Sequence, residues 1–104
     1  MEFGLTPTIV DQIVRIITAC KLPQKIIIFG SRGRQDFKKT SDIDIAVIAD
    51  DFTDRDINII KDRLEETVKT PLKFDVLNFN KLAKTALRNK ILHEGKVIYE
   101  QTKN

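Results

Sequence analysis

The chain has 104 residues, enough for one domain with a single modest core and too few for a second substrate-binding lobe. Its 41% hydrophobic and 32% charged residues are typical of a globular protein and exclude a disordered or fibrous one. The net charge of +3 and the pI near 9.1 permit a polyanionic partner without requiring one.

The N-terminal stretch MEFGLTPTIV lacks the basic segment leading into an apolar one that marks a secretory signal. No apolar run approaches the roughly 18 residues that a membrane span needs. We therefore expect a cytoplasmic protein without membrane association. The lone Cys20 cannot form an internal disulfide and lies in an amphipathic run, where a small buried hydrophobe is the favoured interpretation.

The first half of the chain predicts a helix followed by two strands. Thr6 and Pro7 are typical of a helix start, and aliphatic residues then recur at helical spacing as far as residue 22. Residues 25–29 and 42–49 are short apolar runs rich in β-branched residues, as buried strands are.

The second half predicts a similar alternation. Thr53 can cap a helix with one aliphatic stripe, and residues 73–79 read as a third strand. Asn80 is expected to cap a last long helix that Gly95 ends, with a short final strand after it. Without repeats, linkers or low-complexity tracts, the pattern predicts one α/β domain over residues 1–104.

The segment GSRGRQDFKKTSDID, between the first two strands, contains residues that suit phosphate binding. Gly30 lets the backbone turn sharply and approach a ligand, and Ser31 offers an N–H and a hydroxyl to a phosphate oxygen. A helical turn beginning there would add amides and a partial positive charge. A Gly-Ser pair alone is more often a plain turn, and the basic residues after it could equally form a solvated loop.

Three carboxylates favour the functional interpretation. Asp42 and Asp44 are two positions apart on a strand and so share a face, where like charges repel unless a cation lies between them. Asp75 interrupts an apolar strand and can join them if the second and third strands are neighbours. Together they predict a two-metal phosphoryl-transfer site that uses Mg²⁺. The alternatives are a turn before a solvated strand face for the pair, and a single exposed residue for Asp75.

Gly30-Ser31, ten intervening residues and then Asp42-Ile43-Asp44 resemble the signature of the polymerase-beta nucleotidyltransferase superfamily, with Asp75 as its third carboxylate. The short chain, with GSR after the first strand and SDIDIAV on the second, is similar to the minimal nucleotidyltransferases over residues 6–99. The resemblance implies a polymerase-beta-like nucleotidyltransferase fold, an α/β (α+β) arrangement with a small mixed sheet flanked by helices.

The resemblance also implies roles for individual residues. The nucleotide-binding residues, which would contact the phosphates of ATP or another nucleoside triphosphate, are Gly30, Ser31 and Arg32. The catalytic residues, which would also bind two Mg²⁺ ions, are Asp42, Asp44 and Asp75. The chain departs from the family's usual small-basic-Gly sequence after the arginine, because it reads Gly33-Arg34-Gln35. This departure leaves the local backbone and the role of Arg34 open.

Minimal nucleotidyltransferases resemble one half of two-gene systems whose other half is a HEPN-domain protein. By this resemblance the chain is an antitoxin that transfers AMP onto a hydroxyl of its HEPN partner, and we do not expect direct nucleic-acid binding. Two alternatives remain: a non-catalytic nucleotide-binding subunit that regulates the partner by contact, and a nucleotidyltransferase acting on small molecules such as antibiotics.

Overall fold

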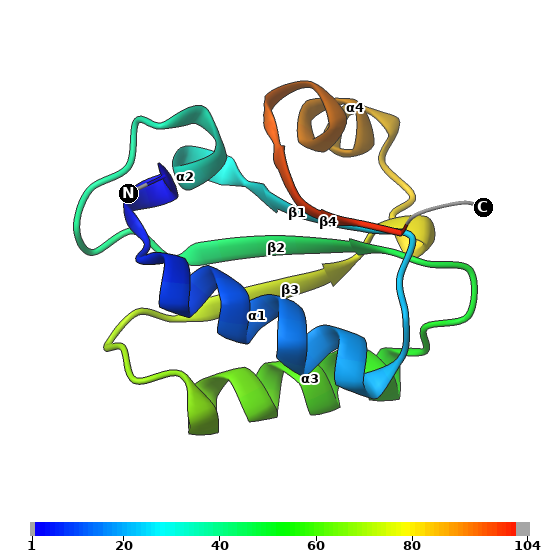
Figure 1. The fold of residues 1–104 in the computed structure, drawn as a ribbon. Coiled ribbons are helices and arrows are strands. Elements are labelled where there is room, and N and C mark those ends of the chain that lie inside the picture. Colours follow the sequence, from blue (N-terminus) through cyan, green and yellow to red (C-terminus); the bar gives the residue numbers. More distant parts are fainter. Residues whose placement is uncertain (1, 102–104) are drawn as a thin grey trace.

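The computed structural model describes residues 2–101, which form helices packed on a four-stranded sheet (Figure 1). The helical elements are η1 (Glu2–Gly4), α1 (Pro7–Cys20), α2 (Gly30–Arg34), α3 (Asp54–Thr67), η2 (Phe79–Lys81) and α4 (Thr85–Glu94). The strands are β1 (Lys25–Phe29), β2 (Ile43–Ile48), β3 (Phe74–Asn78) and β4 (Lys96–Glu100). None of the helices in these described residues has the length and hydropathy needed to cross a membrane.

The sheet is mixed, with the strand order β3-β2-β1-β4. β1 pairs antiparallel with both β2 and β4, whereas β2 and β3 run parallel because α3 carries the chain back between them. The expected α/β class, with a small mixed sheet flanked by helices, is confirmed. The parallel pair brings the starts of β2 and β3 to the same end of the sheet.

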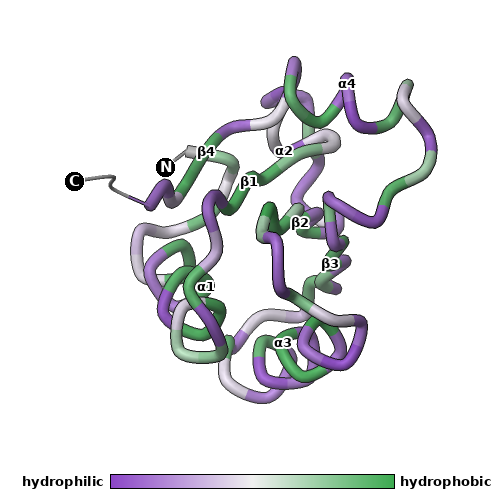
Figure 2. The backbone as a smooth tube through the Cα atoms, turned by 90° about the vertical axis from the view of Figure 1, so that its right-hand side faces the viewer, coloured by the Kyte–Doolittle hydropathy of each residue, from purple (hydrophilic) through white to green (hydrophobic). Residues whose placement is uncertain are grey.

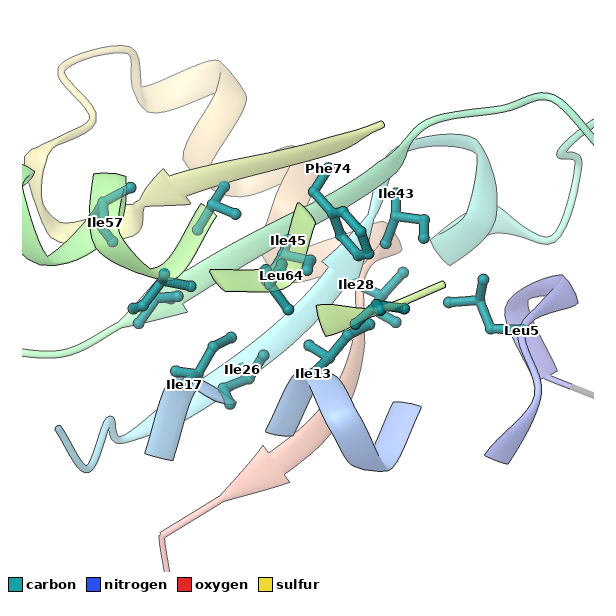
Figure 3. Close-up of a cluster of buried hydrophobic side chains, with 14 of the residues drawn as sticks. Leu5, Ile13, Ile17, Ile26, Ile28, Ile43, Ile45, Ile57, Leu64 and Phe74 are labelled. Atoms are coloured by element: carbon teal, nitrogen blue, oxygen red, sulfur yellow. The ribbon is translucent and has the colours of Figure 1, made fainter. Parts of the chain in front are cut away.

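One face of the sheet is covered by α1 and α3, which enclose the larger core (Figures 1 and 3). Alternate strand residues point into this core because successive side chains of a strand face opposite sides. Figure 2 shows hydrophobic and hydrophilic residues alternating along both helices, as expected for amphipathic helices. The fully buried side chains include Ile13, Ile17, Ile28, Ile45 and Leu64.

The opposite face is covered less completely, by α2 and α4 (Figure 1). A small buried cluster there comprises Ile27, Ala46, Phe79 and Ile91. Around it, Phe29, Ile48 and Leu77 are only half-buried. This face therefore leaves part of the sheet accessible to a ligand.

Two predicted helix starts are confirmed by their hydrogen bonds. The Thr6 hydroxyl accepts from the backbone N–H of Ile9 at 3.2 Å, immediately before Pro7. Thr53 and Asp56 form a reciprocal capping box at the start of α3, with bonds of 2.9 and 3.1 Å. Local side-chain chemistry therefore determines where both helices begin.

The predicted start of the last helix is wrong. Asn80 lies in the short turn η2, and α4 begins only at Thr85. The Asn80 amide donates to the backbone carbonyl of Ala49, at the end of the neighbouring strand, instead of capping a helix. The local pattern assigns the Asn80 side chain to a helix cap, but in the structure this side chain bonds to a carbonyl that is distant in sequence.

Candidate functional site

Gly30 forms the turn between β1 and α2, next to a carboxylate. Its φ of +66° lies in the left-handed region that favours glycine. Asp44 is the register partner of Phe29, and a Cβ added at Gly30 would collide with the Asp44 carboxylate. The turn therefore requires glycine for its backbone conformation, and the missing side chain leaves room for the Asp44 carboxylate beside it.

Ser31 is half-buried in the first turn of α2, so the helical turn expected at this position is present. Within residues 2–101, no side chain caps the N-terminus of this short helix. The first backbone N–H groups of a helix have no partner inside the helix. At this turn they remain donors that a bound anion can use.

Asp44 and Asp75 lie side by side because they are register partners in the parallel β2–β3 pair. Asp42 comes one residue before β2, at the same end of the sheet. Burial, followed by the negative charges of Asp75 and Asp42, raises the pKa of Asp44 to about 6, against the opposing effect of Arg34. The structure thus brings the three predicted carboxylates close enough to influence one another.

The chemistry of these carboxylates fits a divalent cation. Mg²⁺ prefers carboxylate oxygens, and a cation would offset the repulsion that raises the pKa of Asp44. In the described part of the chain, no three Asp, Glu, His or Cys side chains are grouped closely enough to hold a metal ion together. Asp42 and Asp75 are exposed, so their side chains have room to turn toward Asp44.

Two hollows flank the carboxylates. One of about 430 Å³ is lined by both exposed aspartates together with residues of α3 and the loop before β3. The other, of about 120 Å³, lies against Gly30 and is walled by α2 and α4. The polar residues lining the first are Asp42, Lys61, Glu65, Lys73 and Asp75, and those lining the second are Arg34, Lys90 and Glu94.

Arg32 does not lie where the resemblance implies. Its side chain is buried, with only 1% of the residue exposed, and its guanidinium donates to backbone carbonyls outside α2. The nearest acceptors are the carbonyls of Phe3 at 2.8 Å and Ser41 at 2.9 Å. The prediction that the Arg32 side chain contacts phosphate is therefore corrected, because the guanidinium is buried and each of its three nitrogens donates to a carbonyl inside the protein.

Arg34, whose role the sequence left open, lines the smaller hollow. It pairs with Asp36 at 3.1 Å and with Glu94 of α4 at 3.2 Å, so it links α2 to α4. The sequence pattern does not mark Lys90 and Glu94 as residues near the site. No local signal could have found them, because only the packing of α4 beside α2 brings them there.

Comparisons with known sequences agree on one family. The sequence model described as polymerase beta, nucleotidyltransferase matches residues 11–104. The chain is also 33% identical, over 85 residues, to MJ0604 of Methanocaldococcus jannaschii, which carries the name of a protein adenylyltransferase. That alignment covers 73% of this chain and 78% of the relative.

Solved structures share the fold. A toxin–antitoxin structure with AMP-PNP contains a chain with a TM-score of 0.74 and 23% identity, matched over 88% of this chain and 73% of that one. A complex of tri-AMPylated Shewanella oneidensis HEPN toxin with MNT antitoxin gives a TM-score of 0.69 at 22% identity, over 90% and 71% of the two chains.

Proposed function

The chain belongs to the polymerase-beta nucleotidyltransferase family, and on this premise we propose that it transfers AMP from ATP onto a hydroxyl group of a protein partner. The observation that carries the proposal is the contact between the Gly30 turn and Asp44, with Asp75 in register beside it. The name of the archaeal relative and the AMPylated toxin of the solved complex support a protein as the acceptor.

The Gly30-Ser31 turn is assigned the β- and γ-phosphates of the nucleotide. A glycine with positive φ lets backbone amides approach the phosphate oxygens, and the Ser31 hydroxyl adds a further donor. Lys90, which lines the adjoining hollow, would add positive charge near the leaving pyrophosphate, whereas Arg34 there is already paired with Asp36 and Glu94.

Asp42, Asp44 and Asp75 are the residues that would hold Mg²⁺. Bound there, the ion would neutralise phosphate charge and lower the pKa of the attacking hydroxyl. In the transfer, the acceptor oxygen bonds to the α-phosphorus while the bond from that phosphorus to the pyrophosphate oxygen breaks. Asp75, which is exposed at the larger hollow, would accept the hydroxyl proton.

We assign the chain the antitoxin role in a HEPN–MNT pair. The support is the fold shared with chains of toxin–antitoxin structures. On this proposal the HEPN-type partner presents the acceptor hydroxyl, and its docking converts a bimolecular encounter into a positioned attack.

The test is transfer from α-labelled ATP in the presence of Mg²⁺ and the HEPN-type product of the adjacent gene, with mass spectrometry of both chains. We expect one or more AMP additions to the partner with the wild-type chain and none with Asp44→Asn. The matched control is Asp62→Asn, which removes an exposed carboxylate on α3; this variant should transfer AMP at the wild-type rate. Label found only on a small alcohol or antibiotic would contradict a protein acceptor.

A second candidate is a subunit that regulates its partner by contact alone. It is favoured by the lack, within residues 2–101, of a carboxylate group already closed around a metal position. A partner that is inhibited on binding but carries no AMP would support this candidate and would exclude the transferase.

A further inference from the structure

The buried guanidinium of Arg32 connects three segments that are separate in sequence. Nη1 donates to the Phe3 carbonyl at 2.8 Å, and Nε and Nη2 both donate to the Ser41 carbonyl, at 3.1 and 2.9 Å. A longer bond of 3.5 Å reaches the Lys39 carbonyl, and the Phe37 ring lies 4.9 Å from the guanidinium carbon. We call this set of contacts the Arg32 clasp.

The clasp holds the two halves of the sequence motif against each other. Arg32 follows Ser31 directly, and its main acceptor, Ser41, directly precedes Asp42. The loop between them is also closed locally, since the Ser41 hydroxyl accepts from the Lys38 N–H and the Asp36 N–H donates to the Ser31 carbonyl. The Arg32 side chain thus connects the Gly30-Ser31 turn to Ser41, the residue before Asp42.

The N-terminal segment completes the clasp from the other side. Gly4 has a φ of +66°, and a Cβ there would collide with the Phe37 ring and lie 2.8 Å from Nη1 of Arg32. Phe3 also has a positive φ, of 61°, with its ring buried in the main core. This backbone conformation is unfavourable for a bulky residue and persists only where surrounding contacts fix it.

The clasp contains no carboxylate. A buried charge held only by neutral carbonyls is costly to desolvate, and apolar residues of similar volume are often at least as stabilising. A guanidinium has five N–H donors in a rigid plane, so it can bind several carbonyls in fixed directions. The ammonium group of a lysine cannot reproduce this geometry. The contacts therefore point to the orientation of the loop as the role of Arg32.

We propose that Arg32 is a positioning residue that sets the distance between the Gly30-Ser31 turn and Asp42, and that the Phe3–Gly4 segment is part of the same device. The consequence for transfer rests on the proposed function. Misplacing reacting groups by about 1 Å can reduce a rate by about a hundredfold. Loosening the clasp should therefore lower kcat more than it weakens nucleotide binding.

The first test is independent of activity. Amide hydrogen exchange of the 104-residue chain should show faster exchange across residues 36–43 in Arg32→Lys and in Gly4→Ala, with exchange in α3 unchanged. Arg63→Lys, at an exposed position on α3, is the matched control and should exchange like the wild type. Unchanged exchange across residues 36–43 in both clasp variants would overturn the proposal, whatever the protein's activity.

The second test separates positioning from a simple loss of stability. In the AMP transfer assay we expect Arg32→Lys to lower kcat at least tenfold, to keep the KM for ATP within about threefold, and to need more Mg²⁺. Ile17→Ala destabilises the main core without removing a contact of the Arg32 clasp, and this variant should keep the wild-type kcat below its melting temperature. If Arg32→Lys and Ile17→Ala lost the same kcat at the same loss of stability, Arg32 would have only a structural role.

A double variant then tests whether the two ends act through one device. Gly4→Ala combined with Arg32→Lys should lose little more kcat than Arg32→Lys alone, because each breaks the same contacts. Independent, additive losses would contradict the single clasp. A wild-type chain that neither binds ATP nor transfers AMP would contradict the proposed function instead. The hydrogen-exchange measurement would still test the Arg32 clasp, because it does not depend on activity.

Discussion

The two faces of the sheet hold their residues in place by different means. The face under α1 and α3 contains aliphatic side chains that are fully buried, such as Ile17 and Leu64. On the opposite face, Asp44 is half-buried beside Gly30, where burial and like charges raise its pKa to about 6. The comparison indicates that the first face supplies the stability that lets the second keep unfavourable charges at an accessible site.

Removing the central charge should have the largest effect. We expect Asp44→Asn to reduce AMP transfer by about a thousandfold or more, because the amide keeps the shape but loses the charge that would hold Mg²⁺. Single-turnover transfer measured alongside a urea unfolding curve checks this. Turnover close to wild type in a folded variant would remove Asp44 from the catalytic site.

Asp75→Asn should separate chemistry from binding on the same face. We expect turnover to fall about a hundredfold while the nucleotide dissociation constant changes only a few-fold, since Asp75 is assigned to the acceptor hydroxyl rather than to the phosphates. Equilibrium binding of a labelled ATP analogue, compared with kcat, measures the two effects. Parallel losses of binding and turnover would mean that Asp75 has been given the wrong role.

Truncating the core should affect stability without affecting the site. Leu64→Ala, at a fully buried position, is expected to lower the free energy of unfolding by about 3 kcal/mol. Ile48→Ala, at a half-buried position on the other face, should cost about 1 kcal/mol. Urea denaturation provides both numbers, and equal losses would show that the two faces contribute alike.

The smallest effect concerns pH. Because folding raises the pKa of Asp44, the folded state binds this proton more tightly, and metal-free stability should fall as pH rises from about 4 to about 6. We expect Asp44→Asn to be more stable than wild type at pH 7.5, by on the order of 1 kcal/mol after solvent screening, and equal near pH 4. Urea curves in chelator measure this difference, and Mg²⁺ should stabilise only the wild type.

If the wild type were more stable than Asp44→Asn at pH 7.5 without metal, the stability difference would have the opposite sign to the one expected. It would mean that the Asp44 carboxylate has a compensating partner and is not strained by its acidic neighbours.

Much of the fold was predictable because its signals are local. Thr53, the aliphatic stripe after it, and the apolar strand runs each act within a few residues, and the structure confirms them. The close approach of Asp75 to Asp44 was predicted on the condition that the second and third strands are neighbours, and the parallel pairing of β2 with β3 meets that condition.

The errors have a common physical cause. Asn80 and Arg32 each carry side chains that suit a local role, a helix cap and a phosphate contact. In the structure both donate to backbone carbonyls far away in sequence, those of Ala49, Phe3 and Ser41. A pattern within one segment cannot predict which distant carbonyl a donor will reach.

The parallel pairing of β2 and β3 also determines when the site can form during folding. Asp44 and Asp75 lie on opposite sides of the α3 crossover, so they meet only after the chain has closed a long loop. An unfolded chain therefore holds the carboxylates apart and binds a divalent cation weakly. On the proposed function, Mg²⁺ or nucleotide would bind the native state in preference to the unfolded chain and would raise the native population by mass action.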